Sequence, residues 1–341
     1  MNRNLNLVVD MYGCPNRCKH CWLGRIPNKA PDKDIDRRLV DYFKPYFENI
    51  TFYSWLREPD YAPDYKARWE RDKEISIGIQ PQRFELASFY RLARDRQYAK
   101  FLKNTGVKAV QLTFFGMERE TDYFVGRAGA FDELMDATEV LLECGIVPRW
   151  QVFINERNKE ELPELLEFSR LMGLPERCRE IGGEFRFFVH EGSADGENRK
   201  LYDIRICKDS IPEKLIPYYM DYDAVFTEAQ LCEKYRESEE YFIPHNDTDV
   251  TLNISGELDV YFNFTHMTPE WRIGNINTDS WEILIDRILN EKTPALETAR
   301  KMTVGQLTEV YGNRESGRVF RDEDFKMYLL NRAAEEENRC V

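Results

Sequence analysis

Three cysteines near the start of the chain are spaced closely enough to hold one metal centre. Cys14, Cys18 and Cys21 form the pattern C-x3-C-x2-C. Cysteine thiolates are the usual ligands of iron–sulfur clusters, and a [4Fe–4S] cluster normally takes four of them. Three thiolates would hold three irons and leave the fourth iron open to a chelating cofactor or substrate. The spacing therefore predicts a [4Fe–4S] cluster with one exchangeable position.

A structural zinc ion is the alternative for the same loop. His20 stands beside Cys21 and would complete a Cys3His ligand set. Structural zinc sites usually combine two short ligand pairs that a longer loop separates. Here all the candidate ligands lie in one loop, so an iron–sulfur cluster is favoured over a non-catalytic zinc-binding protein.

The elements that must position this loop follow an alternating pattern. Helical patterns separate six short runs rich in β-branched and aromatic residues, and this rhythm predicts parallel strands joined by right-handed crossovers. The expected fold class is α/β: a partial (β/α)6 TIM-like barrel over residues 1–205, with a C-terminal α+β cap over residues 206–341. An open doubly wound sheet is the alternative. The six expected strands are 5–10, 50–55, 74–79, 109–115, 147–154 and 184–189.

Local patterns also place helices, a hairpin and a tail. Apolar residues recur at helical spacing over 131–142 and over 162–171, and Gly145 and Gly173 mark the ends. The segment 249–263 alternates around Ser255-Gly256 and predicts a β-hairpin. We expect residues 335–341 to form a mobile tail.

The cysteine pattern directly after the first expected strand resembles the radical S-adenosylmethionine (SAM) superfamily, and the resemblance extends over about residues 5–190. It implies that the open iron binds the amino and carboxylate groups of SAM. A reduced cluster would then break the C5′–S bond, and the 5′-deoxyadenosyl radical would abstract hydrogen from a substrate. The implied cofactors are a [4Fe–4S] cluster and SAM, with flavodoxin or ferredoxin as electron donor.

The segment after the second expected strand is similar to the family's Gly-Gly-Glu-Pro motif, which contacts the SAM amine. Glu58 and Pro59 match it, whereas Leu56 and Arg57 replace the two glycines. The resemblance therefore implies that Glu58 accepts a hydrogen bond from the cofactor's ammonium group.

Five further residues are expected at the cofactor. The resemblance places Thr113 at the ribose, Arg127 at the SAM carboxylate, His20 beside the adenine, and His190 at the adenine or the substrate. Gln151 lies in an expected strand whose residues alternate between two faces. A polar residue on the inward face of a barrel usually lines a ligand cavity. We therefore place Gln151 in the cofactor pocket as well.

The C-terminal part resembles the extension called SPASM or Twitch, from residue 254 to Trp281. In that extension cysteines bind auxiliary clusters. Here Phe262, Asn263 and Phe264 stand where such a cysteine would be expected, so the shape is predicted without a well-supported auxiliary cluster. Four scattered cysteines keep one auxiliary cluster open as an alternative: Cys178, Cys207, Cys232 and Cys340.

One of these cysteines is also a candidate for catalysis. Cys207 follows the sixth expected strand, on the side of a barrel where active-site loops lie. A thiol there could donate a hydrogen atom to a product radical, so Cys207 is the predicted catalytic residue.

The overall charge limits the classes of partner. The chain has a formal net charge of −13, and a negative field repels the phosphate backbone of nucleic acid. No run approaches the roughly 18 apolar residues that cross a membrane. The first residues also lack the apolar core of a signal peptide. We expect a cytoplasmic protein that contacts neither nucleic acid nor membrane.

The substrate class is inferred from the C-terminal extension and the first expected strand. A small polar molecule is favoured: a sugar, nucleotide sugar, aminoglycoside or nucleoside that undergoes epimerisation, dehydration, dehydrogenation or decarboxylation. A peptide-modifying enzyme is the alternative, because SPASM-like extensions are frequent among peptide maturases. The first expected strand begins almost at once, which leaves no room for an N-terminal peptide-recognition module and favours the small molecule.

Overall fold

Two sheets form the frame of the molecule in a computed structural model that describes residues 4–32, 34–194, 196–244, 249–262 and 267–339. One sheet has the order β2-β1-β7-β8-β9 and the other β3-β4-β5. The strands are β1 (Asn4–Val9), β2 (Asn49–Tyr53), β3 (Ala109–Phe114), β4 (Val147–Phe153), β5 (Arg186–His190), β7 (Asp249–Ile254), β8 (Asp259–Phe262) and β9 (Arg272–Asn275), while β6 (Phe226–Thr227) pairs with β10 (Val319–Phe320).

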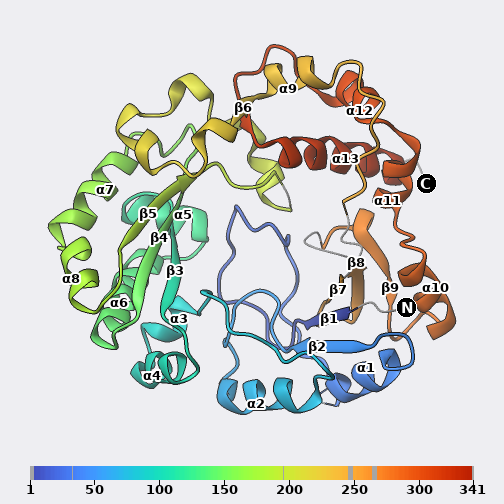
Figure 1. Ribbon diagram of the computed structural model, residues 1–341, viewed down its shortest axis with the longest axis horizontal. Helices are drawn as coiled ribbons and strands as arrows, with labels where there is room; N and C mark the ends of the chain where they lie inside the picture. Colours follow the sequence, from blue (N-terminus) through green and yellow to red (C-terminus); the bar gives the residue numbers. More distant parts are fainter. Residues whose placement is uncertain (1–3, 33, 195, 245–248, 263–266, 340–341) are drawn as a thin grey trace.

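Helices cover the outer faces of the two sheets. Figure 1 shows the sheets on opposite sides of the molecule, with the segment that follows β1 between them. Among the described residues the helices are α1 (Ile35–Phe43), α2 (Tyr65–Ile75), α3 (Phe89–Leu92), α4 (Arg96–Asn104), α5 (Glu118–Val125), α6 (Ala130–Glu143), α7 (Leu162–Leu171), α8 (Leu174–Glu180), α9 (Glu228–Tyr235), α10 (Trp281–Leu289), α11 (Pro294–Lys301), α12 (Val304–Tyr311) and α13 (Asp322–Arg339).

Strand alternation explains which face each sheet buries. In β1, Leu5, Leu7 and Val9 are fully buried and belong to the same core as the apolar face of α1. The alternate residues Asn6 and Val8 line a cavity on the opposite face. The same two-residue period holds in β3 and β7, so apolar residues face the helices and polar residues face the interior of the partial barrel.

The expected α/β fold with a partial TIM-like barrel is confirmed, but the strand expected over 74–79 is wrong. Helix α2 continues to Ile75, and Ile77 makes only an isolated antiparallel bridge to Ile50. Side chains replace the missing ladder: the Phe52 amide donates to Ser76 Oγ at 2.9 Å, and the Ser54 amide donates to Asp72 Oδ2 at 3.0 Å. The edge of β2 is therefore satisfied without a neighbouring strand.

The expected hairpin is present, and it extends the barrel sheet. β7 pairs in parallel with β1, with Leu5 opposite Val250, and β8 returns antiparallel to β7. Asn4 Nδ2 donates to Asp249 Oδ1 at 2.7 Å across this pairing. The division at residues 205 and 206 stays a prediction, and strands from both ranges share one sheet.

The C-terminal residues are helical, which corrects the expected mobile tail. Helix α13 runs to Arg339. Tyr311 Oη donates to Glu336 Oε2 at 2.9 Å, and Thr298 Oγ1 donates to Glu337 Oε2 at 2.8 Å. These bonds to α11 and α12 fix the last turns. Cys340, and also Asn263 and Phe264, lie outside the described residues.

None of the helices that the structure describes combines the length and the apolar character that crossing a membrane would require.

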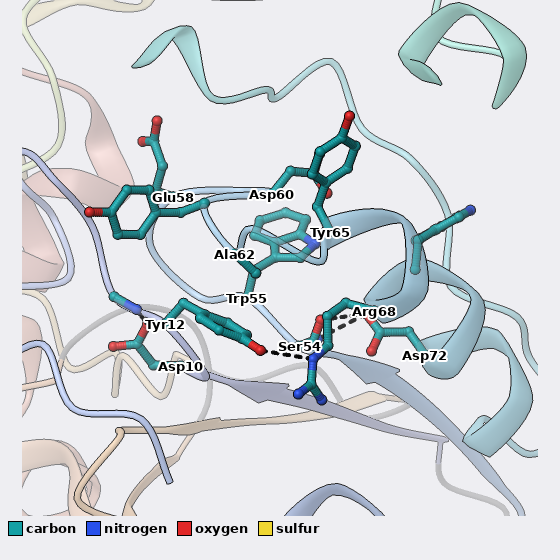
Figure 2. A pocket seen from close by; sticks show the side chains of 13 residues that line it. Asp10, Tyr12, Ser54, Trp55, Glu58, Asp60, Ala62, Tyr65, Arg68 and Asp72 are labelled. Atoms are coloured by element: carbon teal, nitrogen blue, oxygen red, sulfur yellow. Dashed lines mark hydrogen bonds between the residues drawn. The ribbon is translucent and has the colours of Figure 1, made fainter. Parts of the chain in front are cut away.

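Asp72 predicts a pH-dependent stability. It is 1% exposed, and in Figure 2 it lies beside Ser54, whose amide and hydroxyl both donate to its Oδ2. Burial raises the pKa of Asp72 from 3.8 to about 7. The folded state therefore holds a proton that the unfolded state releases, and stability falls as pH rises from about 4 to about 7. The loss is complete above the folded-state pKa.

Asp72→Asn should remove this contribution, because an amide cannot ionise and its oxygen can still accept from Ser54. We expect the variant to gain stability relative to the wild type between pH 4.5 and pH 7.5, measured by urea denaturation under anaerobic conditions. Glu70→Gln, at an exposed position on the same helix, is the matched control and should follow the wild type. If the free energy of unfolding changed equally with pH in Asp72→Asn and the wild type, Asp72 would not be the source of the pH dependence.

Candidate functional site

A large cavity lies inside the partial barrel. Its volume is about 1030 Å³, at the top of the range of roughly 300–1,000 Å³ that is usual for small-molecule sites. The loop after β1, drawn in blue at the centre of Figure 1, forms one wall and carries all three cysteines of the C-x3-C-x2-C pattern. Inward residues of β1, β3 and β7 and the segments after β2 complete it. The cavity is large enough for a cofactor and a substrate together.

The three thiols share one partly buried environment. Desolvation by burial raises the pKa of Cys14, Cys18 and Cys21 above the ordinary value of a cysteine thiol. The Asn16 amide donates to Cys14 Sγ at 3.4 Å. A buried thiolate is unfavourable unless a cation compensates its charge, and coordinated iron provides such a cation. This donor set therefore fits a thiolate-bound cluster.

The described side chains do not form a ready-made site for a single metal ion. Within the described parts of the chain, no group of three or more His, Cys, Asp or Glu side chains could hold one metal ion. A cubane requires something different, because each thiolate binds its own iron at a separate corner. His20, the fourth zinc candidate, packs its ring against Phe115 and Phe153, with centroids 4.4 and 4.7 Å away.

The end of α5 supports the cysteine loop from one side. The Arg17 amide donates to the Val125 carbonyl at 3.0 Å, and the Lys19 amide donates to the Phe124 carbonyl at 2.7 Å. Gly126 has a φ of +75°, and a Cβ there would lie 2.5 Å from the Arg17 carbonyl oxygen. Glycine at this position lets the loop approach α5 closely enough to form both bonds.

Arg57 braces the same loop from the other side. Its Nε and Nη2 donate to Asp10 Oδ2 at 2.9 and 2.6 Å, and its Nη1 donates to the Ile26 carbonyl at 2.7 Å. Asp10 in turn accepts from the Gly13 amide at 3.0 Å. One buried guanidinium thus joins the beginning and the end of the loop that carries the cysteines. The replacement of a family glycine by arginine has a structural role here.

Arg57→Ala should strongly lower the iron content after anaerobic reconstitution, because it breaks a buried ion pair and frees both ends of the loop. Removing one partner of such a pair typically costs about 3–5 kcal/mol. Arg57→Lys should recover only part of the content, since an ammonium cannot donate as a planar fork. Arg25→Ala, on the same loop but 69% exposed at its side chain, is the control. Full iron content in Arg57→Ala would contradict this role.

Glu58 is the acidic group that faces the cysteines. Its Oε2 lies 3.9 Å from Cys14 Sγ, and its buried Oε1 has no hydrogen-bond partner. Burial raises the pKa of Glu58 to about 7, against smaller opposing effects of Ser88 and Arg127. A buried carboxylate oxygen without a partner is costly, and an ammonium group would satisfy it. Glu58 therefore fits the position expected for a contact with the SAM amine.

The two histidines are buried beside aromatic rings. Burial lowers the pKa of His20 to about 3 and that of His190 to about 4, so both are neutral. Gln151 links His190 to β3: its side-chain nitrogen contacts His190 Nε2, and its oxygen accepts from Thr113 Oγ1 at 3.1 Å. The structure thus links Thr113, Gln151 and His190 to one another. Thr113 and His20 line the cavity, whereas Gln151 and His190 are not among its lining residues, so their place at the cofactor stays a prediction.

Two predicted site residues have other surroundings. Arg127 forms a bidentate pair with Glu133 at 2.5 Å, and its Nε donates to Asn16 Oδ1 at 3.1 Å. It therefore supports the cysteine loop. Cys207 is not among the cavity-lining residues; its amide donates to Glu156 Oε1 at 2.7 Å, and it bridges to Arg318. The catalytic role of Cys207 stays a prediction that this position does not support.

Sequence reasoning missed Asp10 and the brace that it forms with Arg57. The available signals were the acidic residue at the end of the first strand and the arginine in place of a glycine. It also missed the aromatic residues Trp55 and Phe84 in the cavity wall. No sequence pattern predicted this position, because Trp55 meets Phe84, which lies outside regular secondary structure between α2 and α3.

The fold and the site together define an enzyme that positions an iron–sulfur cluster at the mouth of a partial α/β barrel. The model of the radical SAM superfamily matches residues 8–169, so this part of the chain is a radical SAM domain. The superfamily implies a [4Fe–4S] cluster and SAM as cofactors, and Cys14, Cys18 and Cys21 fit its cysteine motif. The zinc-binding alternative is therefore not retained.

One curated relative and two solved structures place the chain further. The Fe-coproporphyrin III synthase of Methanosarcina barkeri is 24% identical over 206 residues, which cover 56% of this chain and 48% of the relative. The chain thus aligns with about half of that protein's length. Native anSMEcpe with bound AdoMet has a TM-score of 0.51 at 12% identity over 99% of this chain and 100% of its own. Its complex with AdoMet and the Cp18Cys peptide has a TM-score of 0.50 at 12% identity, with the same coverage. These two structures show a shared fold.

Proposed function

We propose that this chain reductively cleaves SAM and abstracts a hydrogen atom from a substrate held in the cavity. Cys14, Cys18 and Cys21 would hold the [4Fe–4S] cluster. When bound, the cluster and SAM supply the electron transfer and the 5′-deoxyadenosyl radical for this chemistry. The observation that carries the proposal is that three partly buried thiols and the unpartnered carboxylate oxygen of Glu58 face one cavity.

The chain's own residues would bind and orient the cofactor. Glu58 accepts a hydrogen bond from the ammonium group of SAM. Thr113 would contact the ribose, and its hydrogen bond to Gln151 supports this orientation. The neutral His20 ring, supported by Phe115 and Phe153, offers a flat surface for the adenine. These apolar rings also keep water away from the cysteine loop.

A small polar substrate is the first candidate class. Amide and hydroxyl side chains of Asn6, Gln111, Thr251 and Asn253 point from three strands into the cavity. Such groups can bind hydroxyls, carbonyls and amides without adding charge. They support a sugar, nucleotide sugar, aminoglycoside or nucleoside that is epimerised, dehydrated, dehydrogenated or decarboxylated. A flavodoxin or ferredoxin would supply the electron.

Peptide modification is the second candidate. The fold likeness to anSMEcpe covers nearly the whole chain, and one structure of that protein holds the Cp18Cys peptide. A peptide backbone would also find partners among the inward amides. The two candidates differ in what should stimulate SAM cleavage, a soluble metabolite or a precursor peptide.

The proposed chemistry is tested on the anaerobically reconstituted protein. Addition of dithionite and SAM should yield 5′-deoxyadenosine and methionine, measured by liquid chromatography and mass spectrometry. Loaded protein should also show the broad thiolate-to-iron absorbance of an iron–sulfur cluster. A protein with a full complement of iron that forms no 5′-deoxyadenosine would overturn the proposal.

A further inference from the structure

An aromatic wall stands where the barrel lacks a strand. Tyr53 at the end of β2, Trp55 just after it and Phe84 pack together, with ring centroids 6.1, 5.9 and 6.4 Å apart. Phe84 lies in the irregular segment between α2 and α3, beside the gap between β2 and β3. Backbone from this segment reaches β3, because the Gln111 amide donates to the Glu85 carbonyl at 2.7 Å.

This wall is open to the cavity. Phe84 is 49% exposed and Leu86 44%, and both line the cavity that contains the three cysteines. Trp22, in the cysteine loop, is 43% exposed and lines it as well. Single exposed apolar residues are common, but several that line one cavity mark a binding surface. The set favours a flat apolar group, because aromatic rings stack on planar partners.

The charge in the cavity wall is opposite to that of the chain. The protein has 61 acidic and 48 basic residues, yet Glu58 is the only acidic residue in the described cavity lining. Arg17, Lys19 and Arg25, all on the cysteine loop, line the same cavity. Arg25 lies 3.5 Å from Glu197, whereas Arg17 has no ion-pair partner among the described residues. Cations concentrated at one cavity of an acidic protein would attract an anionic ligand.

We propose that the substrate is a planar, largely apolar ring system that carries acidic groups, and this inference rests on the proposed function. Its ring lies on the wall formed by Tyr53, Trp55 and Phe84, and its carboxylate or phosphate faces Arg17 and Lys19. Within the candidate classes above, the inference favours a substrate with an aromatic base and phosphates. It disfavours a cationic aminoglycoside, which the loop would repel.

Two fluorescent probes that differ in one charged group test the inference. 8-Anilinonaphthalene-1-sulfonate is an anion with a planar naphthalene ring, and N-phenyl-1-naphthylamine is the same ring system without the sulfonate. Both are titrated into the reconstituted protein with SAM bound, under anaerobic conditions. Phe84→Ala should weaken the binding of both probes about tenfold, because it removes an aromatic ring on which they stack. Arg17→Ala should weaken the binding of only the sulfonated probe, roughly three- to fivefold, as expected for an exposed charge pair.

Leu171→Ser is the matched control, because Leu171 is 78% exposed on α7, outside the cavity lining. It should change neither affinity. Iron content, measured for each variant, ensures that only loaded protein is compared. Unchanged binding of both probes by Phe84→Ala, or equal loss of both probes in Arg17→Ala, would overturn the inference. The proposed function is judged separately, by 5′-deoxyadenosine formation in the wild type, so the two failures are distinguishable.

Discussion

Alanine in place of any one of Cys14, Cys18 or Cys21 should abolish cluster binding and reduce 5′-deoxyadenosine formation at least a thousandfold. Each thiolate is expected to hold a separate iron, so two remaining thiolates cannot replace the third. His20 is not available as a substitute ligand, because its ring packs against Phe115 and Phe153. Iron and sulfide analysis, together with the visible absorbance of the reconstituted protein, measures the first effect. Chromatography of the reaction products measures the second.

Cys144→Ala is the control for these variants. Cys144 ends α6 and is also a partly exposed free cysteine, but it lies outside the cavity lining. It should retain normal iron content and SAM cleavage. A Cys18→Ala protein that still binds four irons per chain and cleaves SAM would show that the cluster lies elsewhere.

Five of the six expected barrel strands could be predicted because their signals are local. In β3, the buried residues Val110, Leu112 and Phe114 alternate with Gln111 and Thr113, and this period is visible in the sequence. A strand with one face against helices and the other face towards a cavity must alternate between apolar and polar residues. The helices α6 and α7 were predictable for the same reason, since their apolar faces follow the helical period.

The segment 74–79 shows what a local pattern misses. Its apolar residues suit a strand, but Ile75 completes the buried face of α2 together with Tyr65 and Trp69. The open edge of β2 is then satisfied by side chains of Asp72 and Ser76. Tertiary packing thus decided between two structures that the local sequence allowed. The parallel pairing of β1 with β7, about 245 residues apart, was equally beyond local patterns.

At the site, the cysteines were predictable and their supports were not. The spacing of Cys14, Cys18 and Cys21 is a local signal, complete within one loop. The brace depends on Arg57 meeting Asp10 and Ile26, which lie 47 and 31 residues away in the chain. From the sequence, Arg57 could be recognised only as the replacement of a glycine in the family motif. The structure shows that the arginine turns to the loop and leaves Glu58 to face the cavity.

Glu58→Gln should weaken SAM binding about 10- to 100-fold while the cluster remains. A hydrogen bond between charged groups contributes roughly 1.5–3 kcal/mol, which corresponds to this range of dissociation constants. Glutamine has nearly the same shape, so the packing around Cys14 should persist. The buried Oε1 of Glu58 has no other partner to compensate for the loss. Equilibrium dialysis with labelled SAM under anaerobic conditions measures the affinity directly.

The same variant separates cofactor binding from cluster assembly. If Glu58 acts on the ammonium group, iron content should match the wild type, and the SAM concentration for half-maximal 5′-deoxyadenosine formation should rise with the dissociation constant. Glu176→Gln, at an exposed position on α8, provides the matched change of charge far from the cavity and should leave both unchanged. Loss of iron in Glu58→Gln would mean that Glu58 supports cluster binding and does not act on SAM alone. Unaltered affinity would mean that another group binds the amine of SAM.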